Sequence, residues 1–537
     1  MTDTAHVDTF ARDNLPPREQ WPEFLFTLPE LTFAPHLNCA SWLLDRQVAG
    51  GLADRPCIRG PGVSWSYAEL LERANRIAHV LVDEMGLVPG NRVLLRSANN
   101  PQLAACWFAV IKAGGIAVAT MPLLRAKELV DVATKAQVSH ALCDARLGEE
   151  LRAALPACPT LKQVRYFSDS SAQGLEALAA ARSGDFADVP TAADDTCIIA
   201  FTSGTTGKPK GTMHFHRDVV AICECWPRHT LRATADDVFI GSPPLAFTFG
   251  LGGLLLFPLS VGASTALIEK ASPDLLLPAI AEYRASVCFT APTSYRAMAT
   301  HTGEHDLTSL RKCVSAGEAL PAATRSLWKA HTGIEIIDGI GTTEMLHIFI
   351  SADEQHARGG VTGRPVPGYV ACVLDDVGRE VAPGTVGRLA VKGPTGCRYL
   401  ADERQKNYVV DGWNVTGDAY KVDEHGDFVF QARTDDMIVS AGYNIAGPEV
   451  EGALLTHPAV AECAVVGLPD EARGQVVAAF VVLKDPAAAS EALAHELQDF
   501  VKQQIAPYKY PRRVEFSDSL PRTETGKLQR FKLRQPS

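Results

Sequence analysis

The sequence predicts an α/β fold, and three observations support this prediction. Apolar runs typical of buried strands alternate with helix-like segments over the first part of the chain, as in parallel sheets with crossover helices. From about Gly363, short β-like runs follow one another between Pro-Gly and Asp-Gly turns, which indicates a small β-rich subdomain. After Arg433, a compact last unit has helices and a strand of its own.

The expected elements follow in chain order. In the first part we expect strands at residues 92–95, 117–120, 197–201 and 286–289, and helices at residues 67–84, 101–113 and 217–225. A strand at residues 428–431 ends the β-rich subdomain. The last unit is expected to hold a helix at residues 447–455, a strand at residues 463–467 and a helix at residues 489–504.

Length and composition limit the classes of protein that fit the chain. Its 537 residues allow about three or four structural units, and 46% hydrophobic with 21% charged residues is ordinary for a globular protein. A formal net charge of −11 argues against nucleic acid or an anionic membrane as the main partner. The 13 cysteines lack paired C-x-x-C spacing, which favours free thiols in a reducing compartment, so we expect a cytoplasmic protein.

One stretch has the length of a membrane span. Residues 242–268 contain no charged residue and are long enough for a transmembrane helix. Pro243, Pro244, Pro258 and four glycines interrupt this stretch. We therefore expect buried strand, loop and helix there, and no membrane span.

The stretch FTSGTTGKPKGTMHFH, residues 201–216, has the composition of a phosphate-binding loop. It lies between an expected strand and an expected helix, a junction at which backbone N–H groups can approach an anion. Its spacing differs from that of the G-x-x-x-x-G-K-[ST] loop, because Thr202 stands five residues before Gly207. His214 and His216 have no third ligand at a recognisable spacing, so we expect them in the core or on a helix surface.

Four stretches together carry a family resemblance: TSGTTGKPKG at 202–211, GIGTTEMLHIF at 339–349, residues 415–451, and PRTETGKLQR at 521–530. In this order they closely resemble the adenylate-forming superfamily of acyl- and aryl-CoA synthetases, luciferases and peptide-synthetase adenylation domains. The resemblance implies an N-terminal domain, residues 1–433, of two doubly wound sheets plus a small β-barrel-like subdomain. A hinge would join it to a small α+β C-terminal domain, residues 434–537.

The resemblance also implies a reaction and a nucleotide site. A carboxylate is joined to the α-phosphate of MgATP, pyrophosphate leaves, and a thiol attacks the acyl-adenylate. Glu344 would bind Mg²⁺, Thr343 would lie near the α-phosphate, and Lys527 would bridge the carboxylate and the α-phosphate. Where the family often stacks an aromatic residue on adenine, this chain has Ile340. The implied ATP site comprises Thr202, Ser203, Gly204, Thr205, Thr206, Gly207, Lys210, Ala316, Gly317, Glu318, Asp338, Gly339, Ile340, Gly341, Thr342, Asp418 and Arg433.

Within the superfamily, GIGTTEMLHIF and SAGEALP look like the benzoate-CoA ligase branch. The opening HVDTFARDNLPPREQWPEF resembles the 2-aminobenzoate-CoA ligases of that branch. The expected function is therefore activation of 2-aminobenzoate or benzoate and transfer to coenzyme A. For the aromatic side chains, simple core packing is an equal alternative, and for His347 a structural hydrogen bond is one. The expected acid-binding residues are Phe247, Thr248, Phe249, Gly250, Ala316, His347 and Ile348.

The C-terminal part is expected to rotate between the two steps. The resemblance suggests a hinge at Asp435 and a CoA-binding segment formed by Ser440, Ala441, Gly442 and Tyr443. Two alternatives remain at this point: a medium-chain or other acyl-CoA synthetase, and a non-catalytic nucleotide-binding sensor on the same fold. The expected partners are a small aromatic acid, ATP with Mg²⁺, and coenzyme A, and a homodimer is left open.

Overall fold

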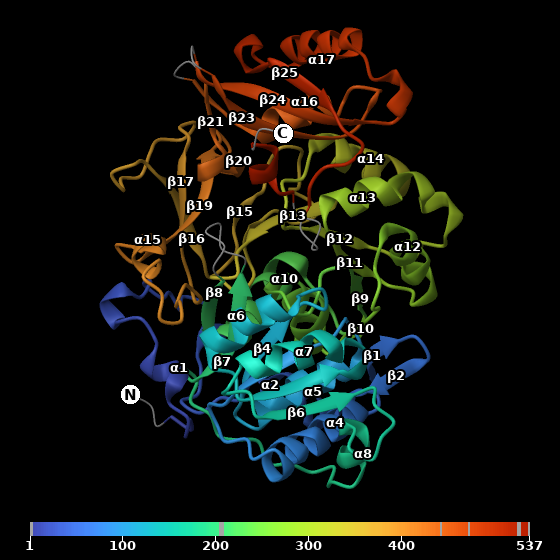
Figure 1. The fold of residues 1–537 in the computed structure, drawn as a ribbon, viewed down its shortest axis with the longest axis vertical. Helices are drawn as coiled ribbons and strands as arrows, with labels where there is room; N and C mark the ends of the chain where they lie inside the picture. The colour runs from blue at the N-terminus through green and yellow to red at the C-terminus, as the bar shows by residue number, and fades with distance from the viewer. Residues whose placement is uncertain (1–3, 203–208, 441–442, 471–472, 523–527, 535–537) are drawn as a thin grey trace.

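Strands of the chain form four sheets within residues 4–202, 209–440, 443–470, 473–522 and 528–534, which are the residues that the computed structural model describes. Two large sheets occupy the N-terminal part of the chain, which is coloured from blue through green to yellow in Figure 1. A small sheet, drawn in orange, lies to one side of them, and the C-terminal sheet, drawn in red, lies above (Figure 1).

A six-stranded sheet has the order β6-β5-β3-β4-β7-β8. Its neighbours pair in parallel, except that β8 runs antiparallel to β7. The strands are β3 (Arg92–Arg96), β4 (Ile116–Thr120), β5 (His140–Asp144), β6 (Gln163–Phe167), β7 (Thr196–Thr202) and β8 (Lys210–Phe215). The covering helices are α4 (Tyr67–His79), α5 (Pro101–Lys112), α6 (Ala126–Ala136) and α7 (Gly148–Ala154).

Alternation of side chains along β3 explains why helices cover both faces of this sheet. Val93 and Leu95 join the core cluster that contains α4 and α5, whereas Leu94 joins the cluster that contains α6 and α7. Because successive side chains of a strand point to opposite faces, a strand that is apolar at every position must be buried on both. The sheet is therefore doubly wound, as predicted.

A nine-stranded sheet has the order β15-β14-β13-β12-β11-β9-β10-β1-β2, with parallel pairing from β13 to β1. One face packs on α12 (Pro273–Glu282), α13 (Pro292–Met298) and α14 (Ala322–Thr332), and the other on α9 (His216–Trp226), α10 (Thr248–Leu251) and α11 (Phe257–Ser260). The strands are β1 (Pro56–Gly60), β2 (Val63–Ser66), β9 (Val238–Gly241), β10 (Ser264–Ala266), β11 (Val287–Thr290), β12 (Lys312–Ser315), β13 (Ile336–Gly341), β14 (Ile348–Ser351) and β15 (Arg364–Pro365).

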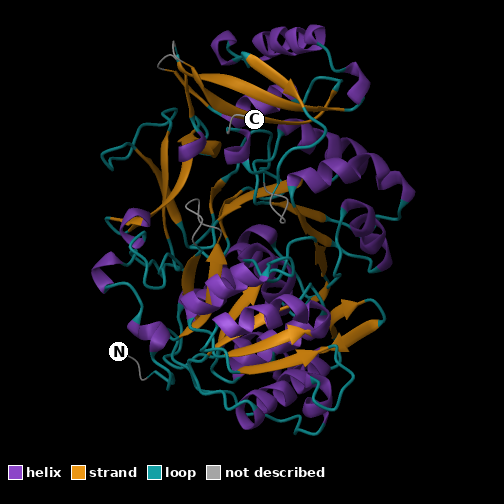
Figure 2. Cartoon of the chain, viewed as in Figure 1, coloured by secondary structure: helices purple, strands orange, loops and turns teal. Residues whose placement is uncertain are grey.

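The two remaining sheets are smaller. The antiparallel third sheet holds β16 (Val370–Leu374), β17 (Gly387–Lys392), β18 (Val409–Val410), β19 (Trp413–Val422) and β20 (Phe428–Arg433), with α15 (Gln405–Tyr408) nearby. The C-terminal sheet holds β21 (Ile438–Ser440), β22 (Tyr443–Ile445), β23 (Val460–Asp470), β24 (Gly474–Leu483) and β25 (Arg513–Phe516), with α16 (Gly447–Leu454), α17 (Glu491–Gln504) and α18 (Arg530–Leu533). Shorter helices are α1 (Phe10–Asp13), α2 (Cys39–Leu43), α3 (Asp45–Gln47) and α8 (Leu175–Ala180). Figure 2 shows this mixture of helix and strand, and the predicted fold class is confirmed.

The glycine-rich stretch does not lie at a strand-to-helix junction, so that prediction was wrong. It connects β7 to the antiparallel strand β8, and α9 begins only at His216. The sequence KGTMHF of β8 lacks a β-branched run, yet it pairs along its length with β7 from Phe215 to Lys210. The missed strand places Lys210 beside Thr202 across the ladder.

The uncharged stretch 242–268 folds as short buried pieces. It follows β9 and contains α10, a π-helical turn at Gly252–Leu256, α11 and β10. Among the described residues, no helix is long and apolar enough to cross a membrane.

Candidate active site

Residues from the two large sheets and the small sheet meet at one place. Lys210 starts β8 of the six-stranded sheet, and Glu344 follows β13 of the nine-stranded sheet, yet Lys210 Nζ lies 3.8 Å from Glu344 Oε1. Asp418 lies on β19 of the small sheet, and it registers directly opposite Arg433 of β20. We call Thr202, Lys210, residues 315–318, residues 338–344, Asp418 and Arg433 the nucleotide region.

A buried tyrosine connects Lys210 with Glu344. Lys210 Nζ donates to Tyr399 Oη at 2.9 Å, and Tyr399 Oη donates to the Glu344 carboxylate. Burial, and then the nearby Glu344 carboxylate, raise the pKa of Tyr399 far above its ordinary range, so the phenol keeps its proton. The carboxylate oxygens of Glu344 are hard donors of the kind that Mg²⁺ prefers, and they therefore fit the implied cation.

His214 fixes the backbone beside this carboxylate. Its Nε2 donates to the carbonyl oxygen of Thr343 at 2.8 Å, and its side chain is fully buried in β8. Burial lowers the pKa of His214 to about 3, with Arg398 contributing, so the ring is neutral. The H-x-H pair thus lies in the core, as expected, but His214 also braces the segment that carries Thr343.

Three buried polar atoms of the nucleotide region have no hydrogen-bond partner within the described part of the chain: Thr202 Oγ1, Ser315 Oγ and Asp338 Oδ1. Such atoms are rare in folded proteins and commonly await a ligand or water. Ser315 and Asp338 are partners across β12 and β13, so two of these atoms belong to neighbouring strands. Burial raises the pKa of Asp338 from 3.8 to about 7. This set suits the hydroxyl and amino groups of a nucleotide.

Asp418 and Arg433 form a pair at the small sheet. Arg433 Nη1 donates to Asp418 Oδ1 at 3.0 Å, and the Asp418 side chain is buried while that of Arg433 is half-exposed. Burial raises the pKa of Asp418, whereas the Arg433 charge opposes that shift. A Cβ at Gly417 would lie 3.1 Å from Arg433 Nη2, and Gly417 has φ +77°, so glycine is required beside the pair.

The predicted acid-binding residues Phe249 and His347 are in contact. Their ring centroids lie 5.7 Å apart, and the rings of Phe257 and Trp226 lie 4.4 and 5.9 Å from His347. A Cβ at Gly252 would come within 2.3 Å of His347 Cδ2, so this glycine makes room for the imidazole. We call these five residues the acid region.

The His347 ring is neutral, and one of its nitrogens has no hydrogen-bond partner among the described residues. Burial lowers its pKa to about 3. Its Nε2 lies 3.3 Å from the carbonyl oxygen of Phe249 and, because a carbonyl only accepts, Nε2 carries the proton. The other nitrogen, Nδ1, is buried and accepts from no described residue. The ring therefore presents a hydrogen-bond acceptor.

The other predicted acid-binding residues are distributed around this region. Phe247 and Thr248 line a small apolar cavity together with Trp107 and Leu245. Gly250 is forced by the chain, because a Cβ there would lie 2.1 Å from the Pro244 carbonyl oxygen. Ala316 and Ile348 are buried in the core cluster that also contains Phe289.

Several predicted residues lie outside the described part of the chain: Ser203, Gly204, Thr205, Thr206, Gly207, Ala441, Gly442 and Lys527. Their flanks are described. Arg522 Nη1 donates to Glu318 Oε1 at 3.0 Å, and Arg522 forms a β-bridge with Leu528. Arg522, which precedes the segment that is not described, is thus bonded to the nucleotide region. Ser440 is buried, and exposed Tyr443 lies 4.7 Å from the ring of Tyr508.

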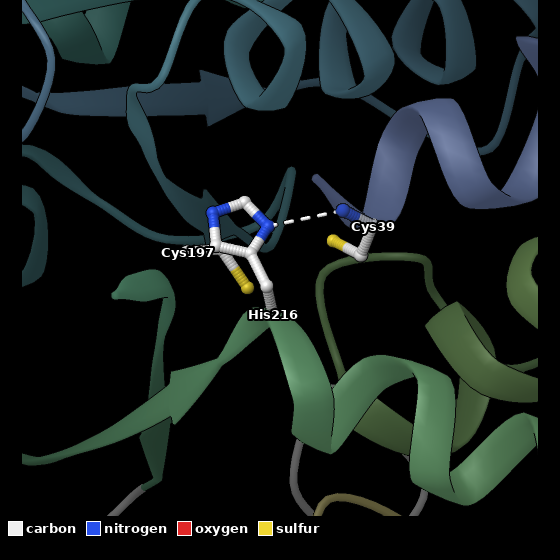
Figure 3. A group of neighbouring side chains, drawn as sticks. All are labelled: Cys39, Cys197 and His216. Atoms are coloured by element: carbon white, nitrogen blue, oxygen red, sulfur yellow. Dashed lines mark hydrogen bonds between the residues drawn. The ribbon is translucent and has the colours of Figure 1, made fainter. Parts of the chain in front are cut away.

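His216 belongs to a separate cluster with Cys39 and Cys197 (Figure 3). One potential ligand atom from each residue lies within 4.8 Å of the others, and all three side chains are fully buried. The backbone N–H of Cys39 donates to His216 Nδ1 at 3.1 Å, so the protein already occupies that nitrogen. Three ligands are one short of the four of a structural zinc site. The expectation of core packing fits this cluster.

The functional candidates that sequence reasoning missed are Tyr399, His214 and Gly252. Tyr399 lies 55 positions from Glu344, and His214 lies 129 positions from Thr343, so no local spacing relates either pair. Gly252 lies in the stretch that the sequence had marked as buried and apolar, but its reason for being glycine is the ring of His347.

Matches to known proteins cover most of the chain. The AMP-binding enzyme family matches residues 44–399, and the AMP-binding enzyme C-terminal domain matches residues 449–527. The chain is 36% identical over 515 residues to the benzoate–CoA ligase of Thauera aromatica, a match that covers 95% of this chain and 98% of the relative.

Two solved structures have the same architecture. The anthranilate CoA ligase AuaEII, in complex with anthranoyl-AMP, superimposes with a TM-score of 0.90 at 33% identity, covering 94% of this chain and 98% of the other. A benzoate CoA ligase from Burkholderia xenovorans LB400 superimposes with a TM-score of 0.85 at 35% identity, covering 93% of this chain and 100% of the other.

Proposed function

The chain belongs to the AMP-binding enzyme family, and we propose that it activates a small aromatic carboxylic acid with ATP and transfers the acyl group to coenzyme A. It is an AMP-forming acid–CoA ligase. Relatives named as benzoate, 3-hydroxybenzoate and 4-hydroxybenzoate CoA ligases support an aromatic acid as its substrate.

One observation carries the proposal of an aromatic substrate. The flat rings of Phe249, Phe257 and Trp226 surround a neutral imidazole at His347, three residues after Glu344. Aromatic faces and edges suit a planar ring and offer little specific contact to a flexible alkyl chain. A carboxylate that reacts near Glu344 would therefore have its ring in the acid region.

The described residues support separate roles for individual side chains in the adenylation step. Thr202 and Lys210 would bind phosphate oxygens, and Asp418 would accept from the ribose hydroxyls, with Arg433 holding its position. Asp338 would accept from the adenine amino group. When bound at Glu344, Mg²⁺ would neutralise charge on the phosphates.

The second step needs the coenzyme A thiol at the same carbonyl carbon. Lys527 would stabilise the developing charge during adenylation and then withdraw as the C-terminal part rotates about Asp435. Ser440, Ala441, Gly442 and Tyr443 would then line the path of the pantetheine arm. The anchoring of Arg522 on Glu318 supports the first of these two arrangements for the structure described here. Ligase chemistry with Lys527, Glu344 and Asp418 all present does not fit a non-catalytic sensor.

A finer assignment follows from the unpaired nitrogen of His347. A benzoate ring that carries an N–H donor would satisfy Nδ1, whereas unsubstituted benzoate would leave it buried without a partner. We therefore propose 2-aminobenzoate as a better substrate than benzoate.

A panel of carboxylic acids with ATP and coenzyme A, read as AMP release, tests both levels. We expect 2-aminobenzoate first, benzoate second, and acetate and palmitate last. Specificity constants for medium- or long-chain acids that equal those of benzoate would contradict the aromatic assignment and favour the alternative acyl-CoA synthetase. A benzoate constant above that of 2-aminobenzoate would contradict only the finer assignment.

A further inference from the structure

The hydroxyl of Tyr399 stands between two opposite charges. It accepts from Lys210 Nζ at 2.9 Å and donates to Glu344, whereas Lys210 and Glu344 themselves are 3.8 Å apart. A phenol offers one proton and lone pairs, so it serves both partners at once. The separation of 3.8 Å is that of a loose ion pair and is beyond the length of a charge-assisted hydrogen bond, so lysine and carboxylate are not hydrogen-bonded to each other.

Tyr399 is held rigidly in this place. Its side chain is 1% exposed, and its backbone N–H donates to Gln405 Oε1 at 2.9 Å. Its ring meets that of Tyr408 edge to face at 5.8 Å, and it forms a β-bridge with Thr212. The hydroxyl therefore has little freedom to follow a movement of the lysine, whereas the four-carbon stem of Lys210 has rotatable bonds.

We propose that Tyr399 is a positioning residue that keeps Lys210 and Glu344 apart, so that the carboxylate can receive a divalent cation. The proposal rests on the proposed function, in which Glu344 binds the cation that accompanies ATP. Without the hydroxyl, the ammonium would close on the carboxylate. Because the Glu344 side chain is only 8% exposed, that direct ion pair would lie in a low dielectric and would compete with the cation.

The arrangement also holds Lys210 in a position from which it can move to the nucleotide. A lysine bonded to a neutral phenol can leave it for a phosphate oxygen more easily than a lysine hydrogen-bonded to a carboxylate, because only the looser 3.8 Å ion pair with Glu344 is given up.

The test measures binding of Mn²⁺ to the nucleotide-free protein by electron paramagnetic resonance, so that Lys210 has no phosphate oxygen to bind and no free nucleotide chelates the Mn²⁺. We expect Tyr399→Phe to weaken Mn²⁺ binding about 10-fold or more, the scale of one hydrogen bond to a charged group. In a Lys210→Met background the same substitution should change Mn²⁺ binding by less than about 2-fold, because no ammonium is left to close on Glu344. A purely structural role would not depend on Lys210.

Tyr67→Phe is the matched control, because it removes another buried tyrosine hydroxyl, one that donates to the Ala263 carbonyl at 2.7 Å. It should leave Mn²⁺ binding unchanged, and thermal melting should show all variants folded at the temperature of the titration. Unchanged Mn²⁺ binding in Tyr399→Phe, or an equal loss in both backgrounds, would overturn the proposal. Wild-type protein that forms no adenylate with any aromatic acid would instead contradict the proposed function.

Discussion

The nucleotide region and the acid region lie side by side, yet they are built on different physical principles. In the nucleotide region two carboxylates have polar or charged partners: Glu344 has Tyr399 and Lys210, and Asp418 has Arg433. The acid region is a group of rings around His347, whose charge is suppressed by burial. One region is organised by charge, and the other by shape and a single hydrogen-bond acceptor.

This difference indicates where reactivity and where selectivity should reside. Phosphate chemistry is the same for every acid that the enzyme activates, so a change in the nucleotide region should affect all acids alike. In the acid region, a change to the hydrogen-bond acceptor should alter the ratio between acids, because in the proposed binding mode that region would contact the ring of the acid.

The largest expected effect is that of Glu344→Gln. The neutral amide keeps the shape of the side chain but removes the charge that would bind the cation, so pyrophosphate release in a single turnover should slow by about 10²- to 10³-fold. Thioester formation from isolated aryl-adenylate and coenzyme A should change much less. The loss should be similar for 2-aminobenzoate and benzoate, and a loss confined to one of them would break the separation between the regions.

A smaller and selective effect is expected for His347→Leu. Leucine fills similar space but offers no acceptor, so the preference for 2-aminobenzoate over benzoate, measured as a ratio of kcat/KM, should fall by about 10-fold. Benzoate itself should react nearly as before.

Phe249→Leu is the matched control for His347→Leu, since it removes a neighbouring ring without removing the acceptor. It should lower kcat/KM for both acids by a similar factor. If His347→Leu also lowered both acids equally, the imidazole would be acting as packing and not as an acceptor.

The sequence predicted the frame of the site better than its contacts. The strand expected at 92–95 is β3 at 92–96, and the helix expected at 101–113 is α5 at 101–112, because strong apolar periodicity determines such elements locally. Strand β8 was not predicted, because its sequence lacks a β-branched run and the strand forms by pairing with β7.

Contacts between distant segments could not be predicted. The Glu344–Tyr399 bond joins a turn after β13 to an isolated β-bridge residue 55 positions away, and neither residue carries a local signal of the other. Asp338 Oδ1 and His347 Nδ1 have no hydrogen-bond partner among the described residues because no donor from another segment packs beside them. Sequence periodicity cannot predict such an arrangement. The contact between Asp418 and Arg433 is of another kind, because the two residues lie directly opposite each other on the adjacent strands β19 and β20.

Two buried aspartates extend the comparison to stability. For Asp338 burial raises the pKa from 3.8 to about 7, although the charge of Arg325 and the N–H of Gly339 act to lower it. For Asp237 burial also acts to raise the pKa, but the hydroxyl of Ser286, the N–H of Thr234 and the guanidinium of Arg311 lower it overall. The Asp338 carboxylate is thus available to a ligand, whereas the Asp237 carboxylate stabilises the fold.

The smallest expected effect is therefore that of Asp338→Asn on stability, and it should depend on pH. A carboxyl with a raised folded-state pKa binds its proton more tightly in the folded state, so the free energy of unfolding falls as pH rises from about 4 to about 7. Asparagine removes this titration. The melting temperature of Asp338→Asn relative to wild type should thus increase by a few degrees between pH 5 and pH 8.

Asp237→Asn should lower the melting temperature by a constant amount over the same range. A carboxyl with a depressed folded-state pKa stabilises the fold above its unfolded-state pKa, and this stabilisation is lost only in acid. Thermal melting from pH 5 to pH 8 measures both differences, and a pH-independent difference for Asp338→Asn would show that burial does not raise the pKa of this carboxyl.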